Sequence, residues 1–273
     1  MEIIVIYRCD EFIESDINPI TNKKYDASWI IFILNDESYK MACGSNNGCA
    51  YTLKVSKKYE HWEMSLCDFI GYNTSIGKNI ILVVSKEEYA QALKKYESCS
   101  FDDHFLREYE NEVLIHSTTK ENYNQIKKDG CLKSWNLVKS QNLCKENEPI
   151  GAFLGDPLEL RDYILFGSGT TGEIVVNSRE KGRIEMDENM EYIVGARLYF
   201  DAKKMAKDGL LVRDGGEIKV KNTLPLHPYL LWVATWDTVG LNSEISTPKI
   251  FAQRADRYFK NNIMKTYEYE HLY

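Results

Sequence analysis

The segment from Val113 to Gly130 constrains the fold most, because it encodes a strand followed by a helix with both ends marked. Three apolar residues, 113–115, run into His116-Ser117-Thr118, which is typical of a buried strand whose last residues emerge at a sheet edge. Thr119 is a good helix N-cap, and Gly130 supplies the left-handed residue that ends many helices. The sequence therefore predicts a strand over 113–118 and a helix from Thr119 to Gly130.

The size and the net charge limit the classes of protein to which the chain can belong. With 273 residues, the chain can form one large or two ordinary domains, each with its own core. A net charge of −7 argues against a broad electropositive surface for nucleic acid, since phosphate binding requires clustered Lys and Arg. A local basic groove is still compatible with this balance.

The chain carries no targeting or membrane signal that we recognise. It starts with a β-like run at 3–7 instead of a signal peptide, and no apolar run is long enough to span a membrane. The seven Cys are scattered and lack a Cys-x-x-Cys pair. We therefore expect a cytoplasmic protein with reduced thiols, no membrane partner and no metal site.

Residues 1–108 are expected to form a small α+β N-terminal domain, and residues 109–273 a second domain. Strands are predicted where β-branched and aromatic residues gather, at 3–7, 29–34, 51–55 and 80–84. Ser85 and Glu88 have the spacing of a capping box that opens a helix. The first domain could position a substrate, neutralise an activity or bind a partner, and its sequence does not choose among these roles.

A second motif lies at 150–163, where we expect a short strand carrying Phe153 to enter a helix carrying Tyr163. The simplest interpretation of both aromatic residues is that they belong to the core. The Gly-rich stretch 166–172 lacks the Lys of a phosphate-binding loop and is predicted to be a hairpin loop that feeds a strand at 173–176. A strand is expected at 195–200.

The third motif starts at Glu217. Alternation around Ile218 and Val220 predicts a strand with Glu217 at its start, followed by a turn and an apolar strand near 229–233. Asp201 should cap a helix over 202–207, and an amphipathic helix is expected at 250–258. By itself, Glu217 could be an exposed charge at a strand end.

Taken in order, the three motifs resemble the ADP-ribosyltransferase superfamily over about residues 112–233. The similarity is to the branch that contains the poly(ADP-ribose) polymerases, the nucleic-acid-modifying DarT toxins and the RNA 2′-phosphotransferases. It implies an α+β fold in which the second domain has a split β-sheet core with helices. The chain departs from the polymerases at Ser117, where they have Gly.

The resemblance also assigns roles to six residues. NAD would be the substrate. His116 would bind the adenosine ribose, Ser117 would hold the nicotinamide amide, Thr118 would support the ribose, and Phe153 and Tyr163 would fix the nicotinamide ring. Glu217 and His116 would be the catalytic residues. Cleavage of the nicotinamide bond passes through an oxocarbenium-like centre, which a carboxylate stabilises. Arg161, Arg197 and Arg213 could meet pyrophosphate, but ion pairing with the many acidic residues is the simpler expectation for each.

These features favour an NAD-dependent mono-ADP-ribosyltransferase, in the manner of a toxin or phage-defence effector, with an antitoxin or regulator as a further partner. Its acceptor would be a nucleic acid or, with nearly equal support, a protein. An inactive NAD or ADP-ribose binding module is an alternative. An RNA 2′-phosphotransferase is another, although those enzymes have Asn-Gly-Val where Gly216-Glu217 stands here. The sequence does not indicate whether polymers form.

Overall fold

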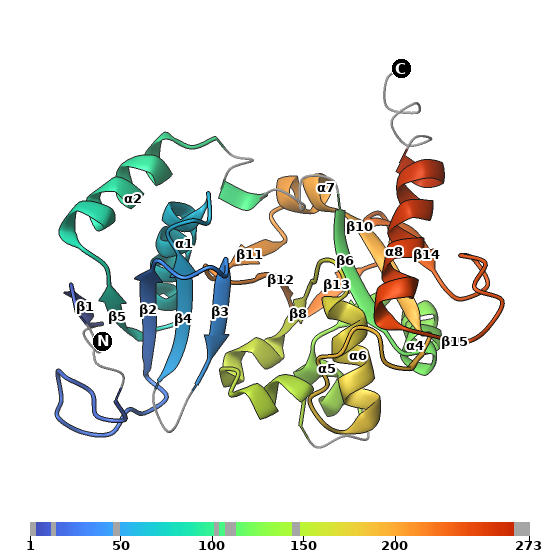
Figure 1. Ribbon diagram of the computed structural model, residues 1–273, viewed down its shortest axis with the longest axis horizontal. Helices are drawn as coiled ribbons and strands as arrows, with labels where there is room; N and C mark the ends of the chain where they lie inside the picture. Colours follow the sequence, from blue (N-terminus) through green and yellow to red (C-terminus); the bar gives the residue numbers. More distant parts are fainter. Residues whose placement is uncertain are drawn as a thin grey trace. The chain divides into compact units, whose positions relative to one another are not determined.

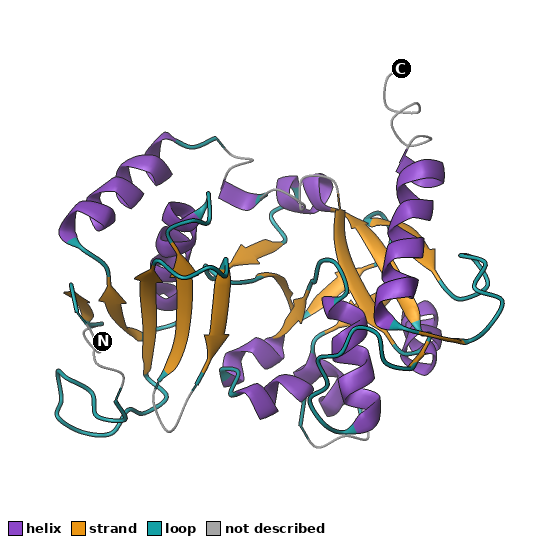
Figure 2. Cartoon of the chain, viewed as in Figure 1, coloured by secondary structure: helices purple, strands orange, loops and turns teal. Residues whose placement is uncertain are grey.

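The computed structural model describes residues 4–11, 15–45, 50–100, 104–106, 113–143 and 148–264. It shows an α+β protein that divides into two compact units, each with helices and strands (Figures 1 and 2). Unit 1 comprises 1–107, 151–161 and 211–219, and unit 2 comprises 108–150, 162–210 and 220–273. The first crossing between the units lies beside the boundary expected at residue 108. Two later segments of the expected second domain belong to unit 1.

Unit 1 is built on a five-stranded sheet in the order β1-β5-β2-β4-β3. Its strands are β1 (Ile6–Cys9), β2 (Trp29–Asn35), β3 (Met41–Gly44), β4 (Tyr51–Ser56) and β5 (Asn79–Val83). The pairs β1/β5, β5/β2 and β2/β4 are parallel, and β3 is antiparallel to β4 at the edge. The predictions at 29–34, 51–55 and 80–84 are confirmed, whereas β1 starts later than expected and β3 was not predicted.

Strands β2 and β5 are buried on both faces, which explains why they are continuous apolar runs. Ile30 and Phe32 of β2 pack in a cluster with α1 (Trp62–Ser75) and α2 (Lys86–Ser98). Trp29 and Ile31 pack in a separate cluster with β5 residues. The predicted capping box of α2 is confirmed, since Glu88 N donates to Ser85 Oγ at 3.1 Å and Ser85 N donates to Glu88 Oε2 at 2.8 Å.

The predicted strand and helix at 150–163 are wrong. The chain forms two 3₁₀ turns, Ile150–Leu154 and Leu158–Asp162, and Tyr163 then opens the short strand β8 (Tyr163–Leu165). Gly155 has a φ of +77° between the turns, and Pro157 disfavours a helical conformation in the residue before it. These two residues stop a continuous helix from forming. Farther along, β11 (Leu211–Arg213) and β12 (Ile218–Lys221) are neighbouring strands.

Unit 2 contains an antiparallel sheet in the order β14-β10-β6. Its strands are β6 (Val113–Thr118), β10 (Ala196–Asp201) and β14 (Leu230–Ala234), as the sequence predicts to within one residue. Helix α4 (Lys120–Asp129) has the expected ends, because Thr119 Oγ1 accepts from Asn122 N at 3.2 Å and Gly130 has a φ of +67°. Helix α7 (Ala202–Lys207) is capped by Asp201, also as expected.

Short elements complete unit 2. Two antiparallel pairs join β7 (Cys131–Lys133) to β13 (Thr223–Pro225) and β9 (Tyr192–Ile193) to β15 (Ile245–Ser246). Helix α5 spans Trp135–Ser140, and α8 spans Pro248–Tyr258 and continues as a π-helix over Phe259–Met264. The amphipathic helix expected at 250–258 is confirmed, and it buries Phe251, Ala252 and Ala255.

The strand predicted at 173–176 is wrong, because this segment lies in helix α6 (Thr171–Lys181). The composition of 174–176 favours a strand, but the buried residues include Glu173, Val176 and Asn177, which have helical spacing. The helix ends at Gly182, whose φ is +63°.

Two further observations concern membranes and thiols. Within the described ranges, no helix has the length and apolar character required to cross a bilayer.

The cysteines in the described part of the chain carry free thiols: Cys9, Cys43, Cys67, Cys99 and Cys131. Cys49 and Cys144 lie outside the described residues.

Candidate functional site

The first group of predicted site residues lies at the end of β6 in unit 2. His116, Ser117 and Thr118 pair with residues 198, 197 and 196 of β10. The Nδ1 atom of His116 is 3.1 Å from the carbonyl oxygen of Leu165, which lies in the strand that Tyr163 opens. Burial lowers the pKa of His116, so the ring is neutral near pH 7. A neutral ring that donates its Nδ1 proton to a carbonyl presents Nε2 as a hydrogen-bond acceptor.

The hydroxyl of Ser117 is part of a buried polar network. It donates to Glu173 Oε1 at 2.6 Å, and Glu173 Oε2 accepts from Arg197 Nη1 at 2.8 Å. The side chains of Glu173 and Arg197 are 0% and 1% exposed. Arg197 also donates to Asp256 and to the hydroxyl of Tyr199. The ion pairing expected for Arg197 is therefore confirmed, and the Ser117 hydroxyl is already committed to a structural contact.

In this network the buried cation Arg197 has carboxylate partners of opposite charge. Burial raises the pKa of Glu173, and the neighbouring Arg197 opposes that rise. Burial acts to lower the pKa of Arg197, but the carboxylates of Glu173 and Asp256 raise it above its ordinary value. Such an arrangement holds β6, β10, α6 and α8 together within unit 2.

Two glycines pack tightly against the end of β6. A Cβ on Gly195 would lie 1.9 Å from the carbonyl oxygen of Thr118, and a Cβ on Gly172 would lie 2.5 Å from Ser117 Oγ. Thr118 is itself buried. The backbone around Ser117 and Thr118 is therefore fixed by close contacts that only glycine permits at positions 172 and 195.

The second group lies in unit 1 and is centred on the turn between β11 and β12. Asp214 Oδ1 accepts hydrogen bonds from the backbone of Gly216 at 3.0 Å and of Glu217 at 2.7 Å. Asp214 Oδ2 pairs with the ammonium of Lys219, a fully buried side chain. The Lys219 ammonium also lies 3.9 Å from the centre of the Tyr72 ring.

The carboxyl group of Glu217 is strongly perturbed in this environment. Burial and then the charge of Asp214 raise the pKa of Glu217 to about 8, with a further contribution from Asp156 and opposition from Lys219 and Arg213. Burial and Asp214 also raise the pKa of Asp156. Burial lowers the pKa of Lys219 despite its carboxylate partner. Perturbed titratable groups gathered in this way mark functional sites more often than ordinary surfaces.

The structure divides the predicted site residues between the units. His116, Ser117, Thr118 and Tyr163 belong to unit 2, whereas Phe153 and Glu217 belong to unit 1. Phe153 lies in a 3₁₀ turn and is 65% exposed, so it is not a core residue. Tyr163 is half-buried at the start of β8 and not on a helix. In the described part of the chain, no group of three or more His, Cys, Asp or Glu residues could hold a metal ion.

The buried Lys219 was not predicted, although the sequence carries a signal for it that it shares with Arg197. Arg197 and Lys219 each interrupt an apolar strand, and a charged residue inside such a run usually needs a buried partner of opposite charge. Their partners, Glu173 and Asp214, could be found only from the fold. Arg213 also has an acidic neighbour, Asp68, at 3.5 Å.

Comparison with other proteins does not add a family. No protein-family model, curated protein or solved structure matches the chain.

Proposed function

We propose that this protein is an NAD-dependent mono-ADP-ribosyltransferase. The observation that carries the proposal is the local structure of 113–133, where β6 ends in His116-Ser117-Thr118 and is followed by capped helix α4 and strand β7. The resemblance implies this order of a strand with His, a helix and then Gly and Leu, and the ends of the helix are those predicted from Thr119 and Gly130 themselves. The proposal extends this to an ADP-ribosyltransferase fold with a split β-sheet core.

His116 has the hydrogen-bonding state that the proposed role requires. Its Nδ1 is engaged with the Leu165 carbonyl and its ring is neutral near pH 7, so Nε2 can accept a hydrogen bond from a ribose hydroxyl. Ser117 would contribute its backbone to the nicotinamide amide, because its hydroxyl contacts Glu173. Thr118 would support the ribose through the rigid strand end, and Phe153 and Tyr163 would contact the nicotinamide ring.

Glu217 would stabilise the reaction centre. In the proposed step, the bond between ribose C1′ and the nicotinamide nitrogen breaks, and nicotinamide leaves neutral with the bonding electrons. An acceptor nucleophile forms a bond to C1′ and gives its proton to Glu217 or to solvent. The ionised carboxylate stabilises the oxocarbenium-like transition state. With a pKa of about 8, Glu217 is a weak stabiliser at pH 7 and a strong one above pH 8.

The proposal assigns His116 and Glu217 to the same reaction. Loss of either His116 or Glu217 should then abolish the same reaction. The two losses should differ in kind, since His116 would serve binding and Glu217 would serve turnover.

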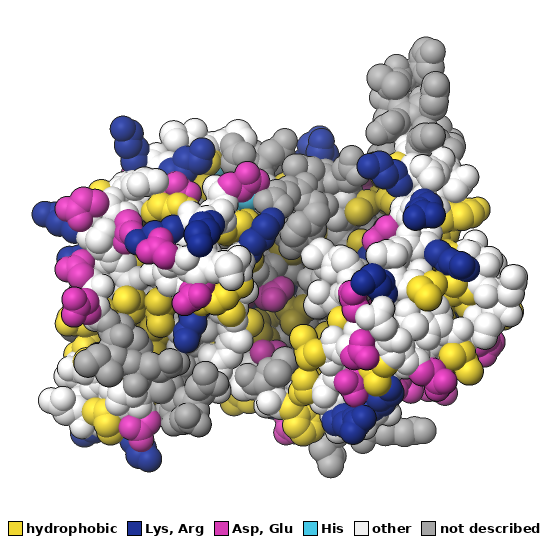
Figure 3. Space-filling view, in the orientation of Figure 1, with side chains coloured by type: hydrophobic (Ala, Val, Ile, Leu, Met, Phe, Trp, Pro, Cys, Tyr) yellow, Lys and Arg dark blue, Asp and Glu magenta, His cyan; other side chains and the backbone are white. Residues whose placement is uncertain are grey.

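The distribution of charged side chains helps to identify the class of acceptor molecule. The face in Figure 3 shows Lys and Arg interspersed with Asp and Glu, without one continuous basic surface, and the net charge is −7. This supports a protein acceptor as strongly as a nucleic acid. The proposal includes a cytoplasmic toxin or defence effector, with an antitoxin or regulator as partner.

Labelled NAD tests the proposal. Wild type, Glu217→Gln and the control Glu87→Gln, which changes an exposed carboxylate of α2, are incubated with a cell lysate and adenylate-labelled NAD. We expect macromolecular label with wild type and the control, and none with Glu217→Gln. Nuclease or protease sensitivity of the label then identifies the acceptor class. If no variant transfers label or releases nicotinamide, the transferase proposal is wrong.

A second candidate is an NAD or ADP-ribose binding module without catalysis. The raised pKa of Glu217 favours it, because a protonated carboxyl group gives little electrostatic help at neutral pH. Binding of NAD without nicotinamide release between pH 6 and pH 9 would support this candidate.

A further inference from the structure

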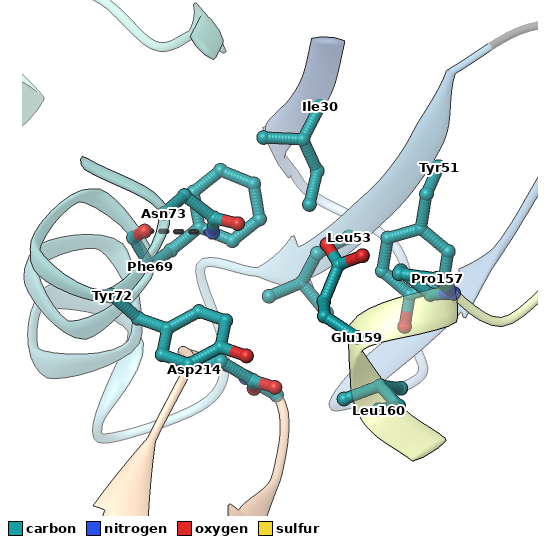
Figure 4. A pocket seen from close by; sticks show the side chains of 11 residues that line it. Ile30, Tyr51, Leu53, Phe69, Tyr72, Asn73, Pro157, Glu159, Leu160 and Asp214 are labelled. Atoms are coloured by element: carbon teal, nitrogen blue, oxygen red, sulfur yellow. Dashed lines mark hydrogen bonds between the residues drawn. The ribbon is translucent and has the colours of Figure 1, made fainter. Parts of the chain in front are cut away.

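Unit 1 contains a small cavity next to the Glu217 turn (Figure 4). Its volume is about 20 Å³, the space of one or two water-sized groups. Apolar and aromatic side chains form most of its walls, and three polar side chains other than tyrosines line it. These three are Asn73 of α1, Glu159 of the second 3₁₀ turn, and Asp214.

Asn73 presents a buried acceptor to this cavity. The residue is 1% exposed, and its Nδ2 donates to the carbonyl oxygen of Phe69 at 2.8 Å. Exchanging the amide nitrogen and oxygen would set two acceptors against each other, so this contact fixes the orientation of the amide. The Oδ1 atom is left without a hydrogen-bond partner among the described residues. A buried acceptor in this state requires a donor.

The two carboxyl groups of the lining are acceptors too. Glu159 pairs with Lys78 at 3.0 Å, and Asp214 pairs with Lys219. Figure 4 shows the Asn73 amide and the Glu159 carboxylate pointing toward each other across the cavity, with the rings of Tyr51 and Tyr72 beside them. The cavity therefore combines oxygen acceptors with aromatic walls and has no cationic side chain in its lining.

Carboxyl groups outnumber ammonium groups around the cavity. The carboxyl groups that interact here number four and the ammonium groups two: Asp156, Glu159, Asp214 and Glu217 against Lys78 and Lys219. The remaining nearby cation, Arg213, has Asp68 as its partner at 3.5 Å. Burial is the main cause of the raised pKa values of Asp156 and Glu217, and the charge of Asp214 adds to both.

We infer that this cavity binds the primary ammonium group of an alkylamine. An ammonium group is about the size of a water molecule, supplies hydrogen-bond donors to Asn73 and Glu159, and is attracted to aromatic faces. A guanidinium group or a nucleobase is too large for the cavity, and an anion would be repelled by the two carboxylates. This inference does not depend on the transferase reaction. The ammonium could belong to a free amine or to a lysine side chain.

Nuclear magnetic resonance of the full-length protein tests the inference. The probe is n-butylammonium chloride, and the readouts are the backbone amide signals of Leu53 and Gly216, which line the cavity. We expect saturable shifts with n-butylammonium and none with n-butanol, butyrate or tetramethylammonium, which lack the charge, its sign or the N–H donors. A capped peptide with one lysine, compared with its acetyl-lysine form, distinguishes the two sources of the ammonium.

Two substitutions connect the binding to the cavity. Asn73→Leu removes the acceptor at similar volume, and Glu159→Gln removes the charge; each should weaken n-butylammonium binding by about tenfold. Glu87→Gln is the control and should bind as wild type does. Circular dichroism confirms that each variant is folded. Unchanged affinity in folded Asn73→Leu, equal binding of n-butanol, or no saturable shift in wild type would overturn the inference.

Discussion

Each unit buries an ionic cluster, and the two clusters differ in charge balance. In unit 2, Glu173 and Arg197 are both buried and form a direct ion pair, to which Ser117, Tyr199 and Asp256 add hydrogen bonds. In unit 1, carboxyl groups outnumber ammonium groups, and the pKa of Glu217 rises to about 8. A buried charge with a partner of opposite sign contributes to a defined structure. A buried excess of one kind of charged group is instead typical of sites that bind a ligand or carry out a reaction.

The largest effect is expected when a buried charge in unit 2 loses its partner of opposite sign. Arg197→Met leaves the Glu173 carboxylate buried without its cation and should lower the free energy of unfolding by about 3–5 kcal/mol. Urea unfolding measures the change. The control Arg183→Met removes an exposed partner of Glu185 and should change stability by less than about 0.5 kcal/mol. Equal effects of the two substitutions would show that the unit 2 network is not a stabilising element.

Removing an unmatched charge should affect turnover instead of folding. Glu217→Gln should lower the turnover number on the order of 10²–10³-fold while NAD still binds, because the carboxylate acts on the transition state. His116→Ala should weaken NAD binding as well. Steady-state nicotinamide release and calorimetric NAD binding separate the two effects. Equal loss of NAD affinity in both variants would contradict this division of roles.

The close packing at the end of β6 gives a third test. In Gly195→Ala, the new Cβ would meet the Thr118 carbonyl, so we expect a loss of about 1–3 kcal/mol in the free energy of unfolding. Gly71→Ala is the control, because Gly71 lies in α1 with open space around its Cβ position. That substitution should stabilise the helix by about 0.5–1 kcal/mol. A tolerated Gly195→Ala would mean that the strand end can move.

The smallest expected effect is on the pH dependence of stability. The ordinary pKa of Glu217 is 4.5 and its folded value is about 8, so between these values the folded protein binds more protons than the unfolded chain. The contribution of Glu217 is therefore most favourable at low pH and is lost as the pH rises through 8. Wild type should lose about 1 kcal/mol relative to Glu217→Gln between pH 7 and pH 8. Denaturant midpoints of both proteins at the two pH values measure this difference.

Local sequence signals predicted much of the fold. The strands at 29–34, 51–55 and 113–118 are apolar runs with clear ends, and Ser85, Thr119 and Asp201 cap helices as expected. Hydrophobic periodicity and capping chemistry act over a few residues, so one sequence suffices to recognise them.

The wrong predictions concern segments whose conformation depends on tertiary contacts. The run Ile174-Val175-Val176 favours a strand by composition, but burial of Glu173 against Arg197 selects the helix α6. Alternation around Ile218 and Val220 implies an exposed residue 219, yet Lys219 is buried on Asp214 and Tyr72. The division of Phe153 and Tyr163 between the two units also depends on long-range packing that no local pattern encodes.

The most direct test of the transferase proposal is the pH dependence of nicotinamide release by purified wild type and Glu217→Gln with saturating NAD. If the ionised Glu217 carries the reaction, wild-type turnover should rise about tenfold per pH unit below pH 8 and level off above it. Glu217→Gln should show low and pH-independent release. Wild-type release that equals that of folded Glu217→Gln at every pH would contradict the proposal.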